Sequence, residues 1–423
     1  MADKYNPFRP DKICPPGMFA GRIDELRAID RCLIQTKNGN PQHFLISGER
    51  GIGKSSILLC ETFVARGLLE TNYNKRRLNF IILELSLSER DDYYNVLKKI
   101  ATELKRRIDG ESKLRALTMT ALDYLSRIEA GGVRFNRNPG SAEPEDIFNH
   151  LQDDLVRILT SLDDRDGVLL LIDEADKAPA ESSLGAICKL LTEELTRRGC
   201  DRLCIGLAGL PSLLDSLKAS HESSVRLFQT MNLKPLDDGE CEQVIDAGLK
   251  EAIEKNGFNI TITPDAKGAL CKLSEGYPHF LQEFAFSAFE EDSDNVIDGK
   301  DVSESLFKEN GAFDQLGRKY FDQYYAAPNS DDYRKMLDAM AEHSDEWISR
   351  AAIIAESGVK GSTVDNGLRA LRTKTLIIQD EMRMGFYKLP TKSFAVWIKA
   401  KKLRQRAALD GQAPMLFERD AEA

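Results

Sequence analysis

Residues 48–55 read Gly-Glu-Arg-Gly-Ile-Gly-Lys-Ser, which matches GxxxxGK(S/T) and constrains the fold of this chain more than any other feature. The pattern follows an apolar run at 44–46 and opens a helical pattern, so we expect a strand, a tight loop and a helix in that order. Backbone N–H groups must turn inward around phosphate groups in such a loop, where a Cβ atom would clash. The segment predicts a phosphate-binding loop at a helix amino terminus, with an ordinary glycine-rich turn as the alternative.

Two side chains of this loop have separate predicted roles. Lys54 is expected to reach the β- and γ-phosphates of a nucleotide, which makes it a candidate catalytic residue. The Ser55 hydroxyl is expected to ligate Mg²⁺. The predicted phosphate-loop residues are Gly48, Glu49, Arg50, Gly51, Ile52, Gly53, Lys54, Ser55 and Ser56.

A second pattern ends in two carboxylates. The apolar run 168–172 is followed by Asp173 and Glu174. Open α/β sheets bind ligands at the carboxyl ends of their strands, so both side chains should lie at the ligand-binding edge. We expect Asp173 to hold Mg²⁺, directly or through water, and Glu174 to act as a general base on the attacking water. Taken alone, the same run equally fits a core strand followed by a solvated turn.

Short apolar runs alternate with helical patterns through the first half of the chain, as in a parallel α/β sheet. Five strands are predicted, at 44–46, 80–85, 168–172, 203–208 and 231–233. The fold class that follows is α/β, a P-loop NTPase core with a parallel five-stranded sheet, over residues 1–236. The core carries an insertion at 86–167, with helical patterns near 91–108, 112–130 and 145–162 and a turn-rich segment at 131–140.

Helical patterns replace the strand runs after residue 236. We expect a helical lid at 237–300, in which Thr263 caps a helix that starts at Pro264. A helical connector at 301–330 follows. Residues 331–405 read as three helices, two strands and a helix, the order of a winged helix-turn-helix domain, and residues 406–423 read as a polar tail.

Composition and charge exclude several classes of protein. The formal net charge is −10, which argues against an overall basic coat for nucleic acid but not against a local basic patch. No run approaches the ~18 apolar residues of a membrane helix, and the polar amino terminus lacks the apolar core of a secretory signal. We therefore expect a cytoplasmic protein without membrane contact. The scattered Cys and His residues have no metal-ligand spacing, so no structural metal is expected.

Phosphoryl transfer also needs positive charge near the γ-phosphate, which an arginine finger can supply. Arg226, just before the fifth predicted strand, is the candidate, because a ring-forming ATPase would present a residue at this place to its neighbour's nucleotide. The rivals are Arg197, Arg198 and Arg202. An ordinary solvated or structural arginine is the alternative.

Together these residues resemble the AAA+ and STAND groups of P-loop ATPases, particularly bacterial and archaeal proteins related to origin-recognition ATPases. Two further motifs carry the resemblance: Phe19-Ala20-Gly21-Arg22-Ile23-Asp24-Glu25-Leu26 is similar to the FxGRxxEL box, and Gly276-Tyr277-Pro278 is similar to the GxP lid motif. The resemblance implies ATP and Mg²⁺ as cofactors and a homo-oligomer. It also implies that Phe19, Gly21 and Arg22 help to enclose the adenine, with Pro278 near the base.

The chain departs from the AAA+ pattern in two places. AAA+ enzymes often place a polar sensor after the fourth strand, where this chain has Ala208-Gly209-Leu210-Pro211 with only Ser212 nearby. No arginine stands beside residues 276–278 as a second sensor. Weak sensing implies slow hydrolysis or a nucleotide switch.

The predicted winged helix is locally basic, with ten basic and three acidic residues between 361 and 405. Val364, Leu368 and Leu371 have helical spacing and should face the core. The residues expected to contact DNA or a partner are Asn366, Arg369, Arg372, Thr373 and, on the wing at 380–384, Arg383. Residues 131–140, with Arg134 and Arg137, form either a second contact or a surface loop.

The sequence thus predicts an ATP-hydrolysing AAA+/STAND ATPase that acts as a nucleotide-dependent switch or oligomeric assembly. One predicted partner is duplex DNA, as for an initiator, a transposition regulator or an antiviral defence factor. The alternative is a signalling switch whose winged helix binds a protein effector and not DNA.

Overall fold

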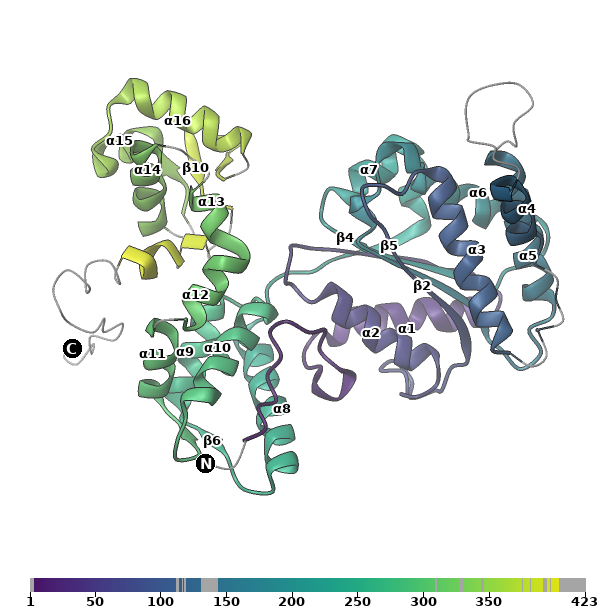
Figure 1. The fold of residues 1–423 in the computed structure, drawn as a ribbon, viewed down its shortest axis with the longest axis horizontal. Helices are drawn as coiled ribbons and strands as arrows, with labels where there is room; N and C mark the ends of the chain where they lie inside the picture. Colours follow the sequence, from purple (N-terminus) through teal and green to yellow (C-terminus); the bar gives the residue numbers. More distant parts are fainter. Residues whose placement is uncertain are drawn as a thin grey trace. The chain divides into compact units, whose positions relative to one another are not determined.

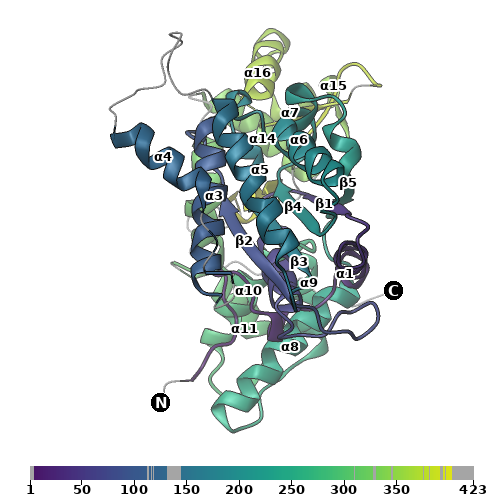
Figure 2. The same cartoon turned by 90° about the vertical axis from the view of Figure 1, so that its right-hand side faces the viewer.

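The computed structural model describes residues 4–402 except 112, 113, 116, 118, 131–143, 309, 327–329, 344, 345, 375, 381, 391–393 and 396. The chain forms two compact units, shown in Figures 1 and 2. Residues 13–234 make up one, which we call the core unit. Residues 1–12 and 235–423 make up the other, which we call the helical unit. The predicted segment 131–140 and the predicted tail lie outside the described residues.

The core unit is built on a parallel five-stranded sheet in the order β2-β3-β4-β1-β5. Its strands are β1 (His43–Ser47), β2 (Phe80–Ser86), β3 (Gly167–Asp173), β4 (Leu203–Gly209) and β5 (Phe228–Asn232). Every residue of β4 is buried, because helices cover both faces of a parallel sheet. The predicted α/β P-loop core with five parallel strands is confirmed. Strand β5 begins at Phe228, earlier than predicted, because two polar residues of this edge strand interrupt the apolar run.

Helices lie on both faces of this sheet (Figures 1 and 2). One face carries α1 (Ile23–Lys37) and α2 (Lys54–Ala65), and the other carries α3 (Tyr93–Asp109), α5 (Pro144–Thr160), α6 (Leu184–Arg197) and α7 (Leu213–Ser220). Alternate residues of β2, β3 and β4 pack with the second group of helices in one buried cluster. The sheet therefore positions its carboxyl edge between two helical layers.

Helix α4 (Thr120–Ala130) is shorter than the predicted helical pattern at 112–130. Its start is fixed by Asp154 of α5, whose carboxylate accepts hydrogen bonds from the backbone N–H groups of Thr120 and Ala121, both at 2.9 Å. An acceptor supplied from another helix stops the helix at that residue, and no local pattern shows it.

The lid region of the helical unit contains α8 (Asp238–Asn256), α9 (Pro264–Ser274), α10 (Pro278–Glu291) and α11 (Gly299–Phe307). Thr263 caps α9 as predicted, accepting a hydrogen bond from the N–H of Ala266 at 3.4 Å. Helix α10 begins at Pro278, after Gly276 with φ +76°. A short parallel pair, β6 (Thr261–Ile262) with β7 (Val296–Ile297), was not predicted, since strands of two residues have no detectable alternation.

The predicted helical connector at 301–330 is divided into short helical segments in the structure. After α11, the chain forms α12 (Ala312–Leu316), a π-helical turn η5 (Gly317–Phe321) and α13 (Asp322–Ala326). The carboxyl-terminal part contains α14 (Asp331–Glu342), β8 (Ile348–Ser349), α15 (Arg350–Ser357), α16 (Gly361–Thr373), β9 (Ile378–Gln379) and β10 (Phe386–Lys388). The three strands pair antiparallel in the order β8-β10-β9. The described residues among 394–402 are helical.

The amino-terminal segment corrects the predicted core boundary of 1–236. Residues 4–12 pack on the helical unit, where the ring of Phe8 lies 6.2 Å from that of Phe289. Phe8 also covers Gly248, since a Cβ atom there would lie 2.6 Å from its ring. Asp11 forms an ion pair of 2.7 Å with Lys319. The segment has no regular secondary structure, so no periodic pattern reveals where it packs.

Among the helices that the structure describes, none combines the length and apolar character that crossing a bilayer needs.

Glu61 of α2 is a buried carboxyl group. It is 0% exposed, and neither of its carboxylate oxygens has a hydrogen-bond partner among the described residues. Burial first, and then the charge of Asp30, hold the pKa of Glu61 well above its usual value. The folded protein therefore keeps a proton that the unfolded chain releases above about pH 4.3. The stabilisation present at low pH is lost as the pH rises toward the pKa of the folded state.

Glu61→Gln is expected to flatten this pH dependence, because the amide cannot ionise in either state. Between pH 5 and pH 8 the melting temperature of the variant should fall by several degrees less than that of the wild type. The scale is about 1.4 kcal/mol per unit of pKa shift and about 2–4 °C per kcal/mol. Glu70→Gln, at an exposed glutamate, is the control. Parallel melting curves for wild type and Glu61→Gln across this range would show that Glu61 does not titrate as described.

Candidate functional site

The phosphate loop lies between β1 and α2, at the carboxyl edge of the sheet. Gly51 and Gly53 have φ of +79° and +101°, which L residues with a Cβ rarely adopt. Gly48 is close-packed, since a Cβ there would lie 2.9 Å from the Ile52 side chain and 3.2 Å from Leu233. Helix α2 begins at Lys54, so its unpaired N–H groups face the loop. This cradle fits a phosphate chain.

Lys54 and Ser55 lie where the sequence predicts. The Lys54 ammonium donates hydrogen bonds to the carbonyl oxygens of Gly48 and Glu49, both at 2.8 Å. Burial lowers the pKa of Lys54, and the charges of Asp173 and Asp176 oppose that shift. Ser55 Oγ donates to Asp173 Oδ2 at 2.6 Å. The two motifs, far apart in the sequence, therefore meet at one point.

The Ser55–Asp173 pair fits the Mg²⁺ site that the sequence predicts. Mg²⁺ in nucleotide sites is usually held by one or two protein oxygens, with phosphates and waters completing the shell. A hydroxyl and a carboxylate oxygen 2.6 Å apart supply that set. Among the described residues, no group of three or more His, Cys, Asp or Glu side chains is arranged to hold a metal ion. The phosphate groups of a nucleotide would have to supply the remaining ligands.

Glu174 follows β3 in a left-handed conformation, with φ +53°. Its carboxylate accepts hydrogen bonds from Lys177 at 2.6 Å and from the Ser86 hydroxyl at 3.1 Å. These contacts, that of Lys177 most, lower the pKa of Glu174 against a smaller opposing effect of burial. The group is thus an ionised carboxylate at neutral pH, as a general base must be, and Lys177 is its partner in this structure.

Two side chains at this edge were missed by the sequence reasoning. Ser86 ends β2, and its hydroxyl contacts Glu174. Asp176, in the 3-10 helix η2 (Ala175–Lys177), accepts a hydrogen bond from the N–H of Leu210 at 2.9 Å. The available signal was that Asp176 lies three residues after Asp173. A turn at the carboxyl end of a strand brings such a residue back to the same edge of the sheet.

Arg22 lies in the box at 19–26 that is predicted to help enclose the adenine, and its side chain is buried. It is 5% exposed, and its guanidinium donates to the carbonyl oxygens of Lys234 and, at 3.4 Å, of Ile52. Gly21 has φ +75°, and Phe19 is half-buried. The structure therefore joins the box to the phosphate loop. Pro278 lies in the helical unit, and contact of these residues with adenine stays a prediction.

Arg226 lies in the 3-10 helix η4 (Ser224–Leu227), immediately before β5. It is exposed, and within the described part of the chain no hydrogen bond or ion pair holds its guanidinium. Its rivals are engaged: Arg197 and Arg198 pair with Glu194, and Arg202 donates to the carbonyl of Arg165.

The register of β1 with β5 also decides how Arg226 can act. His43 pairs with Phe228 and Ser47 pairs with Asn232, so Arg226 lies at the amino edge of the sheet and the phosphate loop at the carboxyl edge. At about 3.3 Å per residue, this separation exceeds the reach of an arginine side chain. Arg226 therefore cannot reach the phosphate loop of its own core unit.

The buried and exposed faces of α16 are those that the sequence predicts. Val364, Leu368 and Leu371 are buried as predicted. The predicted contact residues are all exposed, namely Asn366, Arg369, Arg372, Thr373 and Arg383. Arg372 is hydrogen-bonded to Gln379 of β9. Arg383 pairs with Asp380 at 2.7 Å in the turn between β9 and β10.

The basic charge counted between 361 and 405 is not all on the α16 surface. Lys401 pairs with Asp322 at 2.9 Å and lies over the Trp397 ring, and Lys402 pairs with Glu342 at 3.3 Å. Lys399 donates to the carbonyl of Glu342. These lysines fasten the terminal helix to acidic residues elsewhere in the helical unit. A count of charges along the chain therefore overestimates the basic surface that DNA could meet.

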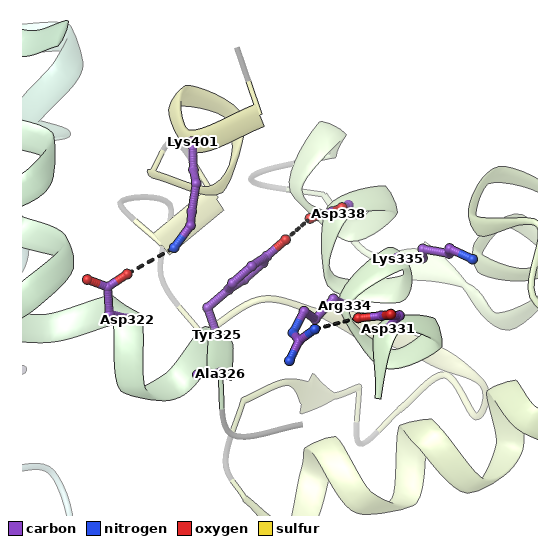
Figure 3. A pocket seen from close by; sticks show the side chains of 8 residues that line it. All are labelled: Asp322, Tyr325, Ala326, Asp331, Arg334, Lys335, Asp338 and Lys401. Carbon is purple, nitrogen blue, oxygen red and sulfur yellow. Dashed lines mark hydrogen bonds and ion pairs between the residues drawn. The ribbon is translucent and has the colours of Figure 1, made fainter. Parts of the chain in front are cut away.

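A cavity of about 620 Å³ lies beside these contacts, between α13, α14 and the terminal helix (Figure 3). Its lining residues are Asp322, Tyr325, Ala326, Asp331, Arg334, Lys335, Asp338 and Lys401. The Tyr325 hydroxyl points to Asp338 and donates to it at 2.9 Å (Figure 3). Each cation of the lining has an acidic partner, so the cavity shows no preference for an anion.

The phosphate loop, the sheet order and the carboxylates after β3 define the core unit as a P-loop NTPase fold. Residues 18–204 match the family described as "AAA ATPase domain". A Walker-type ATPase of Pyrococcus abyssi has a similar fold, with 15% identity and a TM-score of 0.50, over 92% of this chain and 100% of that chain. The ORC2 protein of Aeropyrum pernix matches with 15% identity and a TM-score of 0.49, over 95% of this chain and 98% of that one.

A relative is also found by sequence. An uncharacterised HTH-type transcriptional regulator of Methanocaldococcus jannaschii is 26% identical over 255 residues. The match spans 59% of this chain and 58% of that protein.

Proposed function

We propose that this protein binds and slowly hydrolyses ATP with Mg²⁺, and that the nucleotide controls its conformation and self-association. One observation carries the proposal: the Ser55 hydroxyl lies 2.6 Å from the Asp173 carboxylate, beside Lys54 on the phosphate loop. A cation, an oxygen pair suited to Mg²⁺ and a row of backbone N–H groups would then act at one edge of the sheet. The match of residues 18–204 to an AAA ATPase domain supports it.

Each residue of the site has a separate proposed role in hydrolysis. Lys54 leaves the carbonyl oxygens that it contacts here and binds phosphate oxygens, and the N–H groups of the loop hold the phosphate chain. Ser55 and Asp173 would hold Mg²⁺, which would neutralise charge on the phosphate oxygens. Glu174 orients the attacking water and accepts its proton at a carboxylate oxygen, which requires that oxygen to be released from Lys177 or Ser86. The absence of a polar sensor after β4 favours slow turnover.

The proposed active form is a homo-oligomer in which Arg226 enters the neighbour's site. Arg226→Ala is expected to lower ATP turnover about 10³-fold, the smaller end of the range for an arginine finger, with ATP affinity retained. Arg197→Ala, which removes only an exposed pair with Glu194, is the control and should turn over ATP normally. Turnover and sedimentation should be measured together. Wild-type values of both for Arg226→Ala would rule out a trans role.

DNA is the proposed partner of residues 361–388 of the predicted winged-helix domain at 331–405. The exposed Arg369 and Arg372 on α16, with Arg383 in the β9–β10 turn, support this assignment. So does the relationship to a protein named as an HTH-type transcriptional regulator. The competing function is a switch that binds a protein effector. This alternative is favoured by the contacts that Lys399, Lys401 and Lys402 make inside the helical unit. A defence or initiator role would use the same nucleotide switch.

Salt dependence separates the two partners. If α16 and the wing bind duplex DNA, the logarithm of the affinity should fall linearly with the logarithm of salt concentration, because phosphate contacts release counterions. Arg369→Ala should reduce the slope by about one contact. Fluorescence anisotropy of a labelled duplex measures this with ATP, with ADP and without nucleotide, and Lys300→Ala in the lid region serves as the control. Weak binding with a flat salt profile in all three states would favour the protein effector.

A further inference from the structure

The carboxyl end of β4 is held between Asp176 and the phosphate loop. On one side, the N–H of Leu210 donates to Asp176 Oδ1 at 2.9 Å. On the other side, the carbonyl oxygen of Gly209 accepts a hydrogen bond from the N–H of Gly48 at 3.2 Å. Strand β4 lies between β3 and β1, so one peptide of β4 connects the turn after β3 with the loop after β1.

Gly209 makes this connection possible because it has no side chain. A Cβ atom at this position would lie 2.7 Å from Asp176 Oδ1, 3.1 Å from the Asp176 nitrogen and 2.9 Å from the Leu213 side chain. Contacts under 3.0 Å require something to shift. The small residue at the end of β4 therefore leaves room for a carboxylate that enters from the turn after the neighbouring strand β3.

Gly48 is held from the β4 side by a contact that nucleotide binding leaves in place. Its N–H donates to Gly209, whereas the hydrogen bond from Lys54 to its carbonyl oxygen, 2.8 Å here, is given up when Lys54 binds phosphate. Gly48 is the first residue of the phosphate loop, so its orientation sets the direction in which the following N–H groups point. A loop that must keep several N–H groups aimed at one ligand depends on such a fixed first residue.

We propose that Asp176 is a positioning residue for nucleotide binding, which acts by holding the end of β4 against Gly48. The inference rests on the proposed function, because it assigns Asp176 to the same phosphate-binding site. Asp176, from the turn after β3, thus supplies a polar side chain at the end of β4. Asp176 touches no reacting atom in this arrangement and acts through the β4 peptide and Gly48.

Three variants test the proposal. Asp176→Ala removes the acceptor for the Leu210 N–H, whereas Asp176→Asn keeps an acceptor oxygen and removes only the charge. Gly209→Ala leaves the carboxylate in place but forces it away from β4. Loss of a hydrogen bond to a charged group predicts about tenfold weaker binding of both ATP and ADP for Asp176→Ala and for Gly209→Ala. Asp176→Asn should bind both nucleotides within about twofold of the wild type.

The rescue by asparagine distinguishes a positioning role from a charge effect. Asp215→Asn, at an exposed aspartate of α7, is the matched control for loss of one charge. Melting temperatures identify any variant that fails to fold, and Asp176→Ala alone is sufficient if Gly209→Ala does fail. Wild-type affinity of folded Asp176→Ala, or equal losses in Asp176→Ala and Asp176→Asn, would overturn the proposal. No binding by the wild type would instead refute the proposed function, and the inference with it.

Discussion

Glu174→Gln is expected to bind ATP as the wild type does and to lose almost all hydrolysis. The amide keeps the shape of the side chain and its contact with Ser86, but it cannot accept a proton from water. A general base contributes about 10²–10⁴ in rate, so turnover should fall by at least about 100-fold. The lowered pKa of Glu174 means that the wild-type group is already ionised at neutral pH. Release of phosphate under saturating ATP and Mg²⁺ is the measurement.

The control for this substitution is Glu181→Gln, which changes an exposed glutamate in the 3-10 helix η3 (Ala180–Ser182) just beyond the site. It should hydrolyse ATP at the wild-type rate. Equal turnover by wild type and Glu174→Gln would show that another group takes the proton, and the assignment of Glu174 as general base would be wrong.

Lys54→Ala is expected to weaken nucleotide binding by about 10- to 100-fold, the effect of losing charge-assisted hydrogen bonds to phosphate. Lys54 is half-buried, and burial lowers its pKa, so removing it should not reduce the melting temperature. Retained stability with lost affinity separates a binding role from a folding defect. Lys218→Ala, at an exposed lysine of α7, is the control. Wild-type affinity in Lys54→Ala would contradict the geometry of the phosphate loop.

The strongest sequence predictions concerned segments whose backbone conformation depends on neighbouring residues. Glycines with positive φ, a helix that starts at Lys54 and a buried strand that ends at Asp173 each follow from a short stretch of sequence. The capping of α9 by Thr263 is of the same kind. Local patterns succeed because a few neighbouring residues decide the backbone conformation.

Features that depend on distant contacts could not be predicted in this way. No single strand reveals the order of the strands in the sheet. The hydrogen bonds that join the end of β4 at Gly209 to Asp176 and to Gly48 can therefore be recognised only when β4 is known to lie between β3 and β1. The packing of Phe8 on the helical unit and the late start of α4 at Thr120 have the same cause. In each case the deciding partner lies far away in the sequence.

Calorimetric titration of the wild-type protein with ATP in the presence of Mg²⁺ tests most directly whether residues 48–55 and Asp173 form a nucleotide site. Binding enthalpy varies with temperature and can pass through zero at one temperature. The titration should therefore be carried out at two temperatures. We expect saturable binding of one ATP per chain that Lys54→Ala weakens and that Glu174→Gln retains. Absence of heat at both temperatures for the wild type would contradict the existence of the site.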